Sequence, residues 1–328
     1  MRQTVDVSSG NPLHSVFHTL AYADVFDYPL TASEVYCYLT STKASFEEVS
    51  RALADEALFG RSGEYFTLRG REHIVEIRKR RAEIAARLWI KARRYGRIIA
   101  MLPFVRMVAV TGSLAMNNTD EGKDVDYMIV TAPNYLWTCR ALSLLVAQFA
   151  KLEGVNLCPN YIVTTNALEL KERSLYVAHE LAQMIPLSGL KIYAEMCRLN
   201  DWITDYLPNA LMEPERRDGV SKANRHSMIQ RVLEVLFHLP FVQWFEKWEM
   251  DRKIERLTRA QSHSFESYFS ADVCKGHIDR HGQKTEAELM ERAGFFPHPN
   301  PLPKGEGMVF ERLPPLPMGD CEARGEGR

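Results

Sequence analysis

The stretch Val105–Val130, which reads VRMVAVTGSLAMNNTDEGKDVDYMIV, decides the fold of this 328-residue chain. Its first part, Val105–Thr111, is a run of mostly apolar residues of the kind that forms a buried β-strand. Gly112 and Ser113 end this run, and a short stretch of small residues follows them. A second run, Lys123–Val130, predicts another strand. The order strand, short helix or turn, strand therefore predicts a β-sheet in this part of the chain.

The residues that follow extend the same alternation. Residues 135–152 are expected to form a helix and residues 155–165 a further strand, and residues 167–207 carry apolar side chains at helical spacing, so we expect helix throughout them. Residues 101–210 are thus predicted to form one α/β (α+β) core with a mixed sheet flanked by helices.

Two carboxylates, Asp124 and Asp126, stand at the start of the second expected strand. Because side chains alternate along a strand, these two point to the same face. Carboxylates placed side by side repel each other unless a cation lies between them. Mg²⁺ prefers hard oxygen ligands and binds through one or two carboxylates together with substrate phosphates. The pair therefore predicts a Mg²⁺ site.

Gly112 and Ser113 are the expected phosphate-binding residues. They end one strand and open a helix or turn, where backbone N–H groups without Cβ obstruction can hold a phosphate. A phosphate site beside a metal-binding carboxylate pair is what transfer from a nucleoside triphosphate (NTP) requires. These residues therefore favour phosphoryl-transfer chemistry.

The motif resembles the nucleotidyltransferase fold of the DNA polymerase beta superfamily. The resemblance covers about a fifth of the chain, residues 105–165, and the wider arrangement is similar to an uncharacterised group of bacterial proteins with an N-terminal winged helix. It implies that Gly112 and Ser113 hold the triphosphate and that Asp124 and Asp126 bind the metal and are catalytic. The implied reaction is Mg²⁺-dependent transfer of a nucleotidyl group from an NTP to a hydroxyl on an acceptor.

A third carboxylate is usual in active members of this superfamily, on a neighbouring strand. In residues 155–165 the candidate positions hold Asn156 and Asn160, and Asn160 stands where we expect the acid. An amide cannot accept a proton or neutralise a second metal. The alternative is therefore a catalytically impaired member that binds nucleotide as a regulatory signal.

The sequence does not identify another acid that could supply the third carboxylate. No spacing selects one of the nearby glutamates, which are Glu153, Glu169 and Glu195. His179-Glu180 lacks the second histidine of a zinc protease motif, so we assign it no function.

Residues 13–70 are expected to form a separate winged-helix-like unit. An apolar stretch of helical spacing from Leu13 is followed by two capping-box signatures, Thr31–Glu34 and Ser45–Glu48, each of which predicts a helix start. Gly63 within Phe59–Leu68 predicts a β-hairpin. The unit is either a nucleic-acid binder or an adaptor that packs on the rest of the chain.

The helix in the position of a recognition helix, Ser45–Leu58, argues against DNA binding. It carries four acidic residues and only Arg51 as a cation. Such a helix would be repelled by phosphates. The adaptor interpretation is therefore favoured.

Residues 69–97 are expected to form a basic amphipathic helix, and residues 71–100 are assigned as the basic helix that connects the N-terminal unit to the core. The stretch has eleven Lys and Arg against three Glu, a net charge of +8. The favoured interpretation is that these cations pair with the acidic remainder of the chain. The alternative is a face that binds the phosphates of a nucleotide or a nucleic acid.

The last part of the chain has two sections. Residues 222–260 are expected to be helical within a helical C-terminal region of residues 211–295. Residues 296–328 are rich in Pro and Gly and are expected to be disordered.

The composition sets the remaining limits. A net charge of −1 argues against a protein whose whole surface is basic. No apolar stretch approaches about 18 residues, so we expect no membrane-spanning helix. Six dispersed cysteines and an N-terminus without an apolar segment are typical of a cytoplasmic protein.

Overall fold

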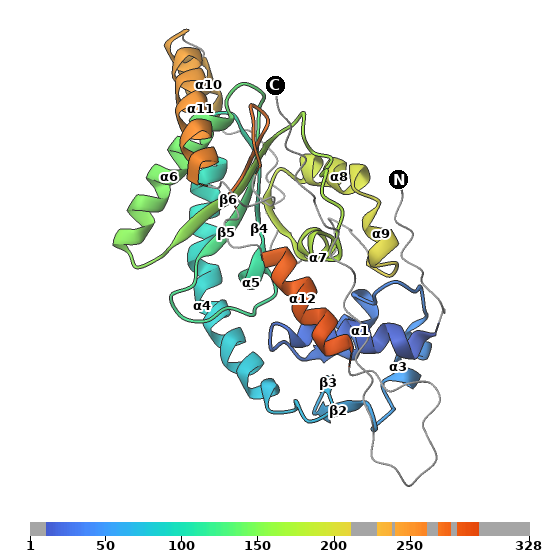
Figure 1. Ribbon diagram of the computed structural model, residues 1–328. Helices are drawn as coiled ribbons and strands as arrows, with labels where there is room; N and C mark the ends of the chain where they lie inside the picture. The colour runs from blue at the N-terminus through green and yellow to red at the C-terminus, as the bar shows by residue number, and fades with distance from the viewer. Residues whose placement is uncertain (1–10, 211–227, 238–239, 261–267, 277–280, 295–328) are drawn as a thin grey trace, which may run out of the picture.

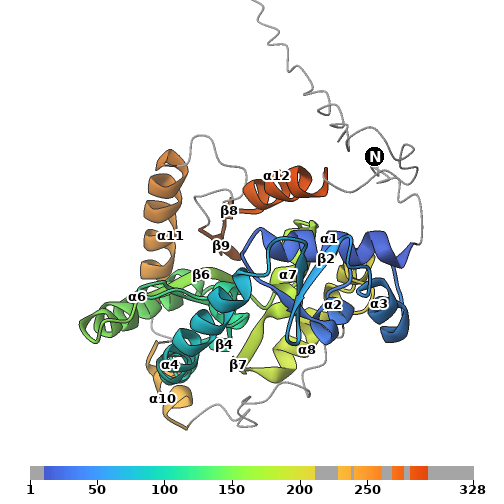
Figure 2. The ribbon, with the colours of Figure 1, turned by 90° about the horizontal axis from the view of Figure 1, so that it is seen from below.

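The computed structural model describes residues 11–210, 228–237, 240–260, 268–276 and 281–294. It is a mixed α/β structure with two sheets, one of three strands in the order β1-β3-β2 and one of six in the order β7-β4-β5-β6-β9-β8. The larger sheet carries helices on both faces, and the N-terminal helices lie together at one end of it (Figures 1 and 2).

The middle of the larger sheet is formed by the two strands of the stretch Val105–Val130 and by the next strand along the chain. β4 (Val105–Val110) and β5 (Val125–Thr131) are antiparallel, with Val108 opposite Ile129. β6 (Leu157–Thr164) lies parallel to β5. The expected strands are confirmed, with boundaries that differ by a few residues.

Both faces of β4 and β5 are buried, so their side chains divide between two cores. Val108 and Ile129 pack with α4 (Ile74–Ala100) and with α6 (Leu136–Leu152), whereas Met107 and Met128 pack on the opposite face. This division follows the two-residue period of a strand. It also explains the nearly continuous apolar runs, since a strand that is covered on both sides has no solvent-facing positions.

The expectation of continuous helix over residues 167–207 is wrong. The chain forms α7 (Leu175–Gln183), β7 (Ile185–Ser188), α8 (Leu190–Leu199) and α9 (Ile203–Tyr206). β7 pairs antiparallel with β4 as the edge strand of the sheet, a position that tolerates the proline it contains.

A glycine fixes the turn between β7 and α8. Gly189 has φ of 72°, and a Cβ there would lie 2.2 Å from the carbonyl oxygen of Arg106 on β4. Only glycine fits such a left-handed residue pressed against a neighbouring strand.

The helical expectation for residues 211–295 holds for α10 (Met228–Phe237), α11 (Pro240–Ala260) and α12 (His281–Ala293). It is wrong for β8 (Tyr268–Phe269) and β9 (Val273–Lys275), which extend the larger sheet beyond β6. Residues 211–227 and 296–328, the latter expected to be disordered, lie outside the described residues.

The N-terminal unit has the expected three helices and hairpin. α1 (Pro12–Asp24) is followed by β1 (Leu30–Thr31), α2 (Ala32–Cys37), α3 (Phe46–Ala52), β2 (Phe59–Ser62) and β3 (Tyr65–Leu68). Both capping boxes are present, at the starts of α2 and α3, but α3 ends at Ala52 and not near Leu58.

The unit packs on the rest of the protein through several polar contacts. The Tyr28 hydroxyl donates to the carbonyl oxygen of Met116 (2.8 Å), and Asn209 donates to that of Ala44 (2.9 Å). The backbone N–H of Ser41 donates to the carbonyl oxygen of Tyr206 (2.8 Å). These contacts fix the unit against the loop that follows β4 and against the end of α9.

The basic segment forms α4 (Ile74–Ala100), which begins five residues later than expected. Within the described part of the chain, seven of the eleven cations of residues 69–97 form ion pairs with acidic side chains: Arg71, Arg78, Lys79, Arg80, Arg81, Arg87 and Arg94. The pairing favours the interpretation that these charges serve packing. Among the described residues, no helix has the length and apolar character needed to cross a membrane.

Candidate functional site

A cavity of about 880 Å³ lies between the N-terminal unit and the larger sheet. All five residues singled out from the sequence line it: Gly112, Ser113, Asp124, Asp126 and Asn160. The structure therefore brings the expected phosphate-binding and metal-binding residues into one site. We call it the site cavity.

Asp126 lies on β5, one residue inside the strand, and Asp124 is an exposed residue just before it. Gly112, which opens the four-residue helix α5 (Gly112–Ala115), has φ of 65°. A Cβ on Gly112 would lie 2.9 Å from Oδ2 of Asp126. The glycine is thus required both for its backbone conformation and for the close approach of this carboxylate.

The environment of Asp126 disfavours its negative charge. Burial raises the pKa of the Asp126 carboxyl to about 6, with a further contribution from the charge of Asp124. Hydrogen bonds from the side chains of Cys158 and Asn160 act in the opposite direction, because they stabilise the carboxylate. A divalent cation beside this pair would relieve both the burial cost and the repulsion.

Asn160 has a positioning role in this arrangement. It lies on β6, the strand next to β5, and its side chain hydrogen-bonds Asp126. The residue that stands where an acid was expected therefore orients the carboxylate beside it.

Glu180 brings a third carboxylate to the site cavity from helix α7. Burial raises the pKa of Glu180 to about 7, and the charge of Asp126 adds to the effect. The carboxylate accepts a hydrogen bond from the backbone N–H of Gly112. Glu180 is thus within electrostatic reach of Asp126 and in contact with the expected phosphate-binding loop.

The sequence pattern gave Glu180 no function, because the third acid was expected on the strand next to Asp126 and not on a helix. The available signal was a single acidic residue within an apolar helical stretch, between Val177-Ala178 and Leu181. The three glutamates considered instead form ion pairs elsewhere, with Arg94 for Glu153, Arg173 for Glu169 and Arg198 for Glu195.

The residues present fit a Mg²⁺ ion that is completed by a substrate. In the described part of the chain, no three His, Cys, Asp or Glu side chains are grouped so as to hold a metal by themselves. Mg²⁺ keeps water and phosphate oxygens among its ligands and needs only one or two carboxylates from the protein. Asp124 and Asp126 supply oxygen ligands of that kind beside the loop expected to hold phosphate.

Comparison of the chain with protein-family models, with curated proteins and with solved structures gave no match.

Proposed function

We propose that this protein is a nucleotidyltransferase that transfers a nucleotidyl group from an NTP to a hydroxyl acceptor, with Mg²⁺ bound at Asp124 and Asp126. One observation carries the proposal. Asp124, Asp126 and Glu180, three carboxylates from different positions in the sequence, line the same cavity as the Gly112–Ser113 loop. The strand order also agrees with the resemblance, because the Gly-Ser loop and the Asp-x-Asp motif are carried by adjacent antiparallel strands, β4 and β5.

Asp124 and Asp126 would hold the metal through their carboxylate oxygens. When bound, Mg²⁺ polarises the α-phosphate and stabilises the leaving pyrophosphate. Asn160 would keep Asp126 oriented through its hydrogen bond. Because burial and repulsion already raise the free energy of the ionised pair, metal binding is favoured by the relief of that cost.

Glu180 would act as the general base. Its pKa of about 7 matches the working range of a group that accepts a proton from a hydroxyl near neutral pH. In this role it replaces the strand carboxylate that Asn160 cannot supply. The acceptor hydroxyl would give its proton to Glu180 as its oxygen bonds to the α-phosphate, and the bond from the α-phosphate to the leaving pyrophosphate would break.

Gly112 and Ser113 would hold the triphosphate through their backbone N–H groups. The N–H of Gly112 is hydrogen-bonded to Glu180 in this structure. A phosphate oxygen would take the place of the Glu180 carboxylate on that N–H, which would release the carboxylate towards the acceptor. Nucleotide binding and activation of the base would then be coupled.

A nucleotide-binding protein without turnover is the second candidate, and the Glu180–Gly112 hydrogen bond favours it if phosphate cannot displace the carboxylate. Nucleic-acid binding through residues 69–97 is the third, and the ion pairs of α4 weigh against it.

The test is NTP binding with Mg²⁺ followed by pyrophosphate release. We expect the wild type to bind at least one NTP and to release pyrophosphate when an acceptor is present, and Asp126→Asn to lose both. Glu195→Gln is the matched control, because it removes a half-buried glutamate that does not line the site cavity and whose partner Arg198 lies on the same helix. Binding that needs Asp126 but gives no pyrophosphate with any acceptor would support the second candidate. No NTP binding by the wild type would exclude the proposal.

A further inference from the structure

Two chemically different groups of side chains line the site cavity. One group is three carboxylates, Asp124 and Asp126 at β5 and Glu180 on α7. The other group is aromatic rings from the N-terminal unit and from α7: Tyr22, Phe26, Tyr38 and His179. We call this set the aromatic wall.

The aromatic wall is uncharged near neutral pH. Burial lowers the pKa of His179 to about 3, so its imidazole is neutral. Its ring is stacked on that of Tyr22, with centroids 4.0 Å apart and planes 9° apart. Asp27, at the edge of the wall, is paired with Arg71 at 2.5 Å. A ligand in the cavity therefore meets both carboxylates and flat, neutral rings.

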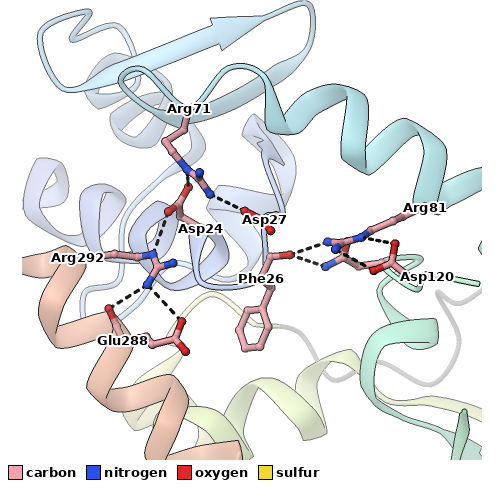
Figure 3. A network of polar contacts seen from close by, with 9 residues as sticks. Asp24, Phe26, Asp27, Arg71, Arg81, Asp120, Glu288 and Arg292 are labelled. Atoms are coloured by element: carbon pink, nitrogen blue, oxygen red, sulfur yellow. Dashed lines mark hydrogen bonds and ion pairs between the residues drawn. The ribbon is translucent and has the colours of Figure 1, made fainter. Parts of the chain in front are cut away.

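Phe26 differs from the other aromatic residues of this region in its exposure. Its relative exposure is 38%, against 5% for Tyr22 and 6% for Tyr28. Its ring centroid lies 5.5 Å from that of Tyr22. In Figure 3 the ring projects away from the surrounding guanidinium–carboxylate contacts. One face of an apolar ring is thus left open to the site cavity.

The backbone that carries this ring is held from several directions (Figure 3). The carbonyl oxygen of Phe26 accepts hydrogen bonds from Arg81 and from Asn118, each at 3.0 Å. The next residue, Asp27, has φ of 50° and is paired with Arg71, which also binds Asp24 at 2.8 Å. A left-handed non-glycine residue persists only where its surroundings hold it. The backbone that carries the Phe26 ring is therefore held in one conformation.

The backbone of Phe26 is also connected, through Asn118, to the Gly112–Ser113 loop that is expected to hold phosphate. The backbone N–H of Asn118 donates to the carbonyl oxygen of Ser113 (2.8 Å), while its side chain donates to that of Phe26. The open ring and the Gly112–Ser113 loop are thus fixed relative to each other by Asn118.

We propose that Phe26 is the platform on which the base of the donor nucleotide stacks, so that the N-terminal unit forms the base-binding half of the site. This inference rests on the proposed function. A nucleotide has the matching chemistry, with a charged phosphate end for the metal and the Gly-Ser loop and a flat neutral ring for the aromatic wall. Stacking on an aromatic side chain tolerates any of the four bases, so the platform sets affinity for nucleotides as a class.

The test compares Phe26→Ala with the wild type for two probes, each with Mg²⁺. The first is the NTP that the wild type binds most tightly, and the second is inorganic tripolyphosphate, which has the phosphates but no base. We expect the dissociation constant of the NTP to rise about ten- to hundredfold and that of tripolyphosphate to stay the same. Phe26→Tyr, which keeps a ring, should bind the NTP as the wild type does.

Phe46→Ala is the matched control, because Phe46 is also exposed (48%) and belongs to the N-terminal unit but does not line the site cavity. It should leave both dissociation constants unchanged. Equal NTP binding by the wild type and Phe26→Ala would overturn the stacking role while the proposed function stands. An equal loss for both probes would also overturn it, because the loss would then come from the phosphate end. If the wild type bound neither probe, the proposed function would fail together with this inference.

Discussion

Asp120 and Asp126 line the same cavity, yet their carboxyl groups are shifted in opposite directions. A hydrogen bond from Arg81 of α4 lowers the pKa of Asp120, whereas burial and the charge of Asp124 raise that of Asp126. The α4 side of the cavity therefore has its charges compensated within the protein. At β5, by contrast, burial and the repulsion between Asp124 and Asp126 disfavour the ionised form of Asp126, and a bound cation would stabilise it. The difference separates charges that hold the structure together from charges that are available for chemistry.

The largest effect is expected at Glu180, the carboxylate proposed as the base. Glu180→Gln keeps the size of the side chain and its hydrogen bond to Gly112 but cannot take up a proton. Pyrophosphate release should fall by about a hundredfold or more, with little change in the dissociation constant of the NTP. Glu195→Gln is the control for this substitution, and it should release pyrophosphate at the wild-type rate. A full rate in Glu180→Gln would remove this residue from the mechanism.

A smaller effect, on stability, is expected when Arg81 is removed. Its side chain is 16% exposed and binds Asp120, Asn118 and the carbonyl oxygen of Phe26. Arg81→Ala removes one hydrogen-bond partner from each of these acceptors and should lower the free energy of unfolding by about 2 kcal/mol, as measured in urea. NTP binding should weaken as well, because the support of Phe26 is loosened. If Arg81→Ala unfolded with the same free energy as the wild type, the contacts of Arg81 would not contribute to the stability of the protein.

Asp126→Asn should raise the stability of the metal-free protein, in a way that depends on pH. The folded pKa of about 6 lies above the ordinary value of 3.8, so ionised Asp126 destabilises the fold. This cost is absent below about pH 4, grows as the pH rises to about 6 and is constant above that. We expect the variant to gain about 1–3 kcal/mol at pH 8 and nothing at pH 4.

Thermal melts of the wild type and Asp126→Asn in EDTA, at pH 4, 6 and 8, measure this difference. If Asp126→Asn were more stable than the wild type by the same amount at all three pH values, the charge of the Asp126 carboxylate would not be the cause of the difference. Added Mg²⁺ should narrow the difference at pH 8 by stabilising the wild type alone.

The smallest effect is expected on the outer surface of α4. Arg87 pairs with Glu121 at 3.4 Å, and the two side chains are 70% and 80% exposed. Such pairs contribute little because water and salt screen them. Arg87→Ala should change the free energy of unfolding by less than about 0.5 kcal/mol in the same urea experiment. If Arg87→Ala lowered the free energy of unfolding as much as Arg81→Ala does, buried and exposed ion pairs of α4 would contribute equally to stability, contrary to this expectation.

Local sequence signals predicted most of the elements correctly. The capping boxes at Thr31 and Ser45 are satisfied within four residues, so they act whatever the rest of the chain does. The turn at Gly63 is equally local. Apolar spacing did not distinguish β7 from helix, because a four-residue edge strand is too short to establish a period of its own.

The sequence by itself determined the Asp-x-Asp pair, the Gly-Ser turn and the strands that carry them, because each depends on contacts or backbone preferences within a few residues. Tertiary structure alone decided which further groups join them. Glu180 reaches the site from a helix about fifty residues after Asp126. Phe26 reaches it from the N-terminal unit through Arg81 and Asn118. Sequence spacing does not predict that these residues line one cavity, because their positions depend on how separate elements pack against one sheet.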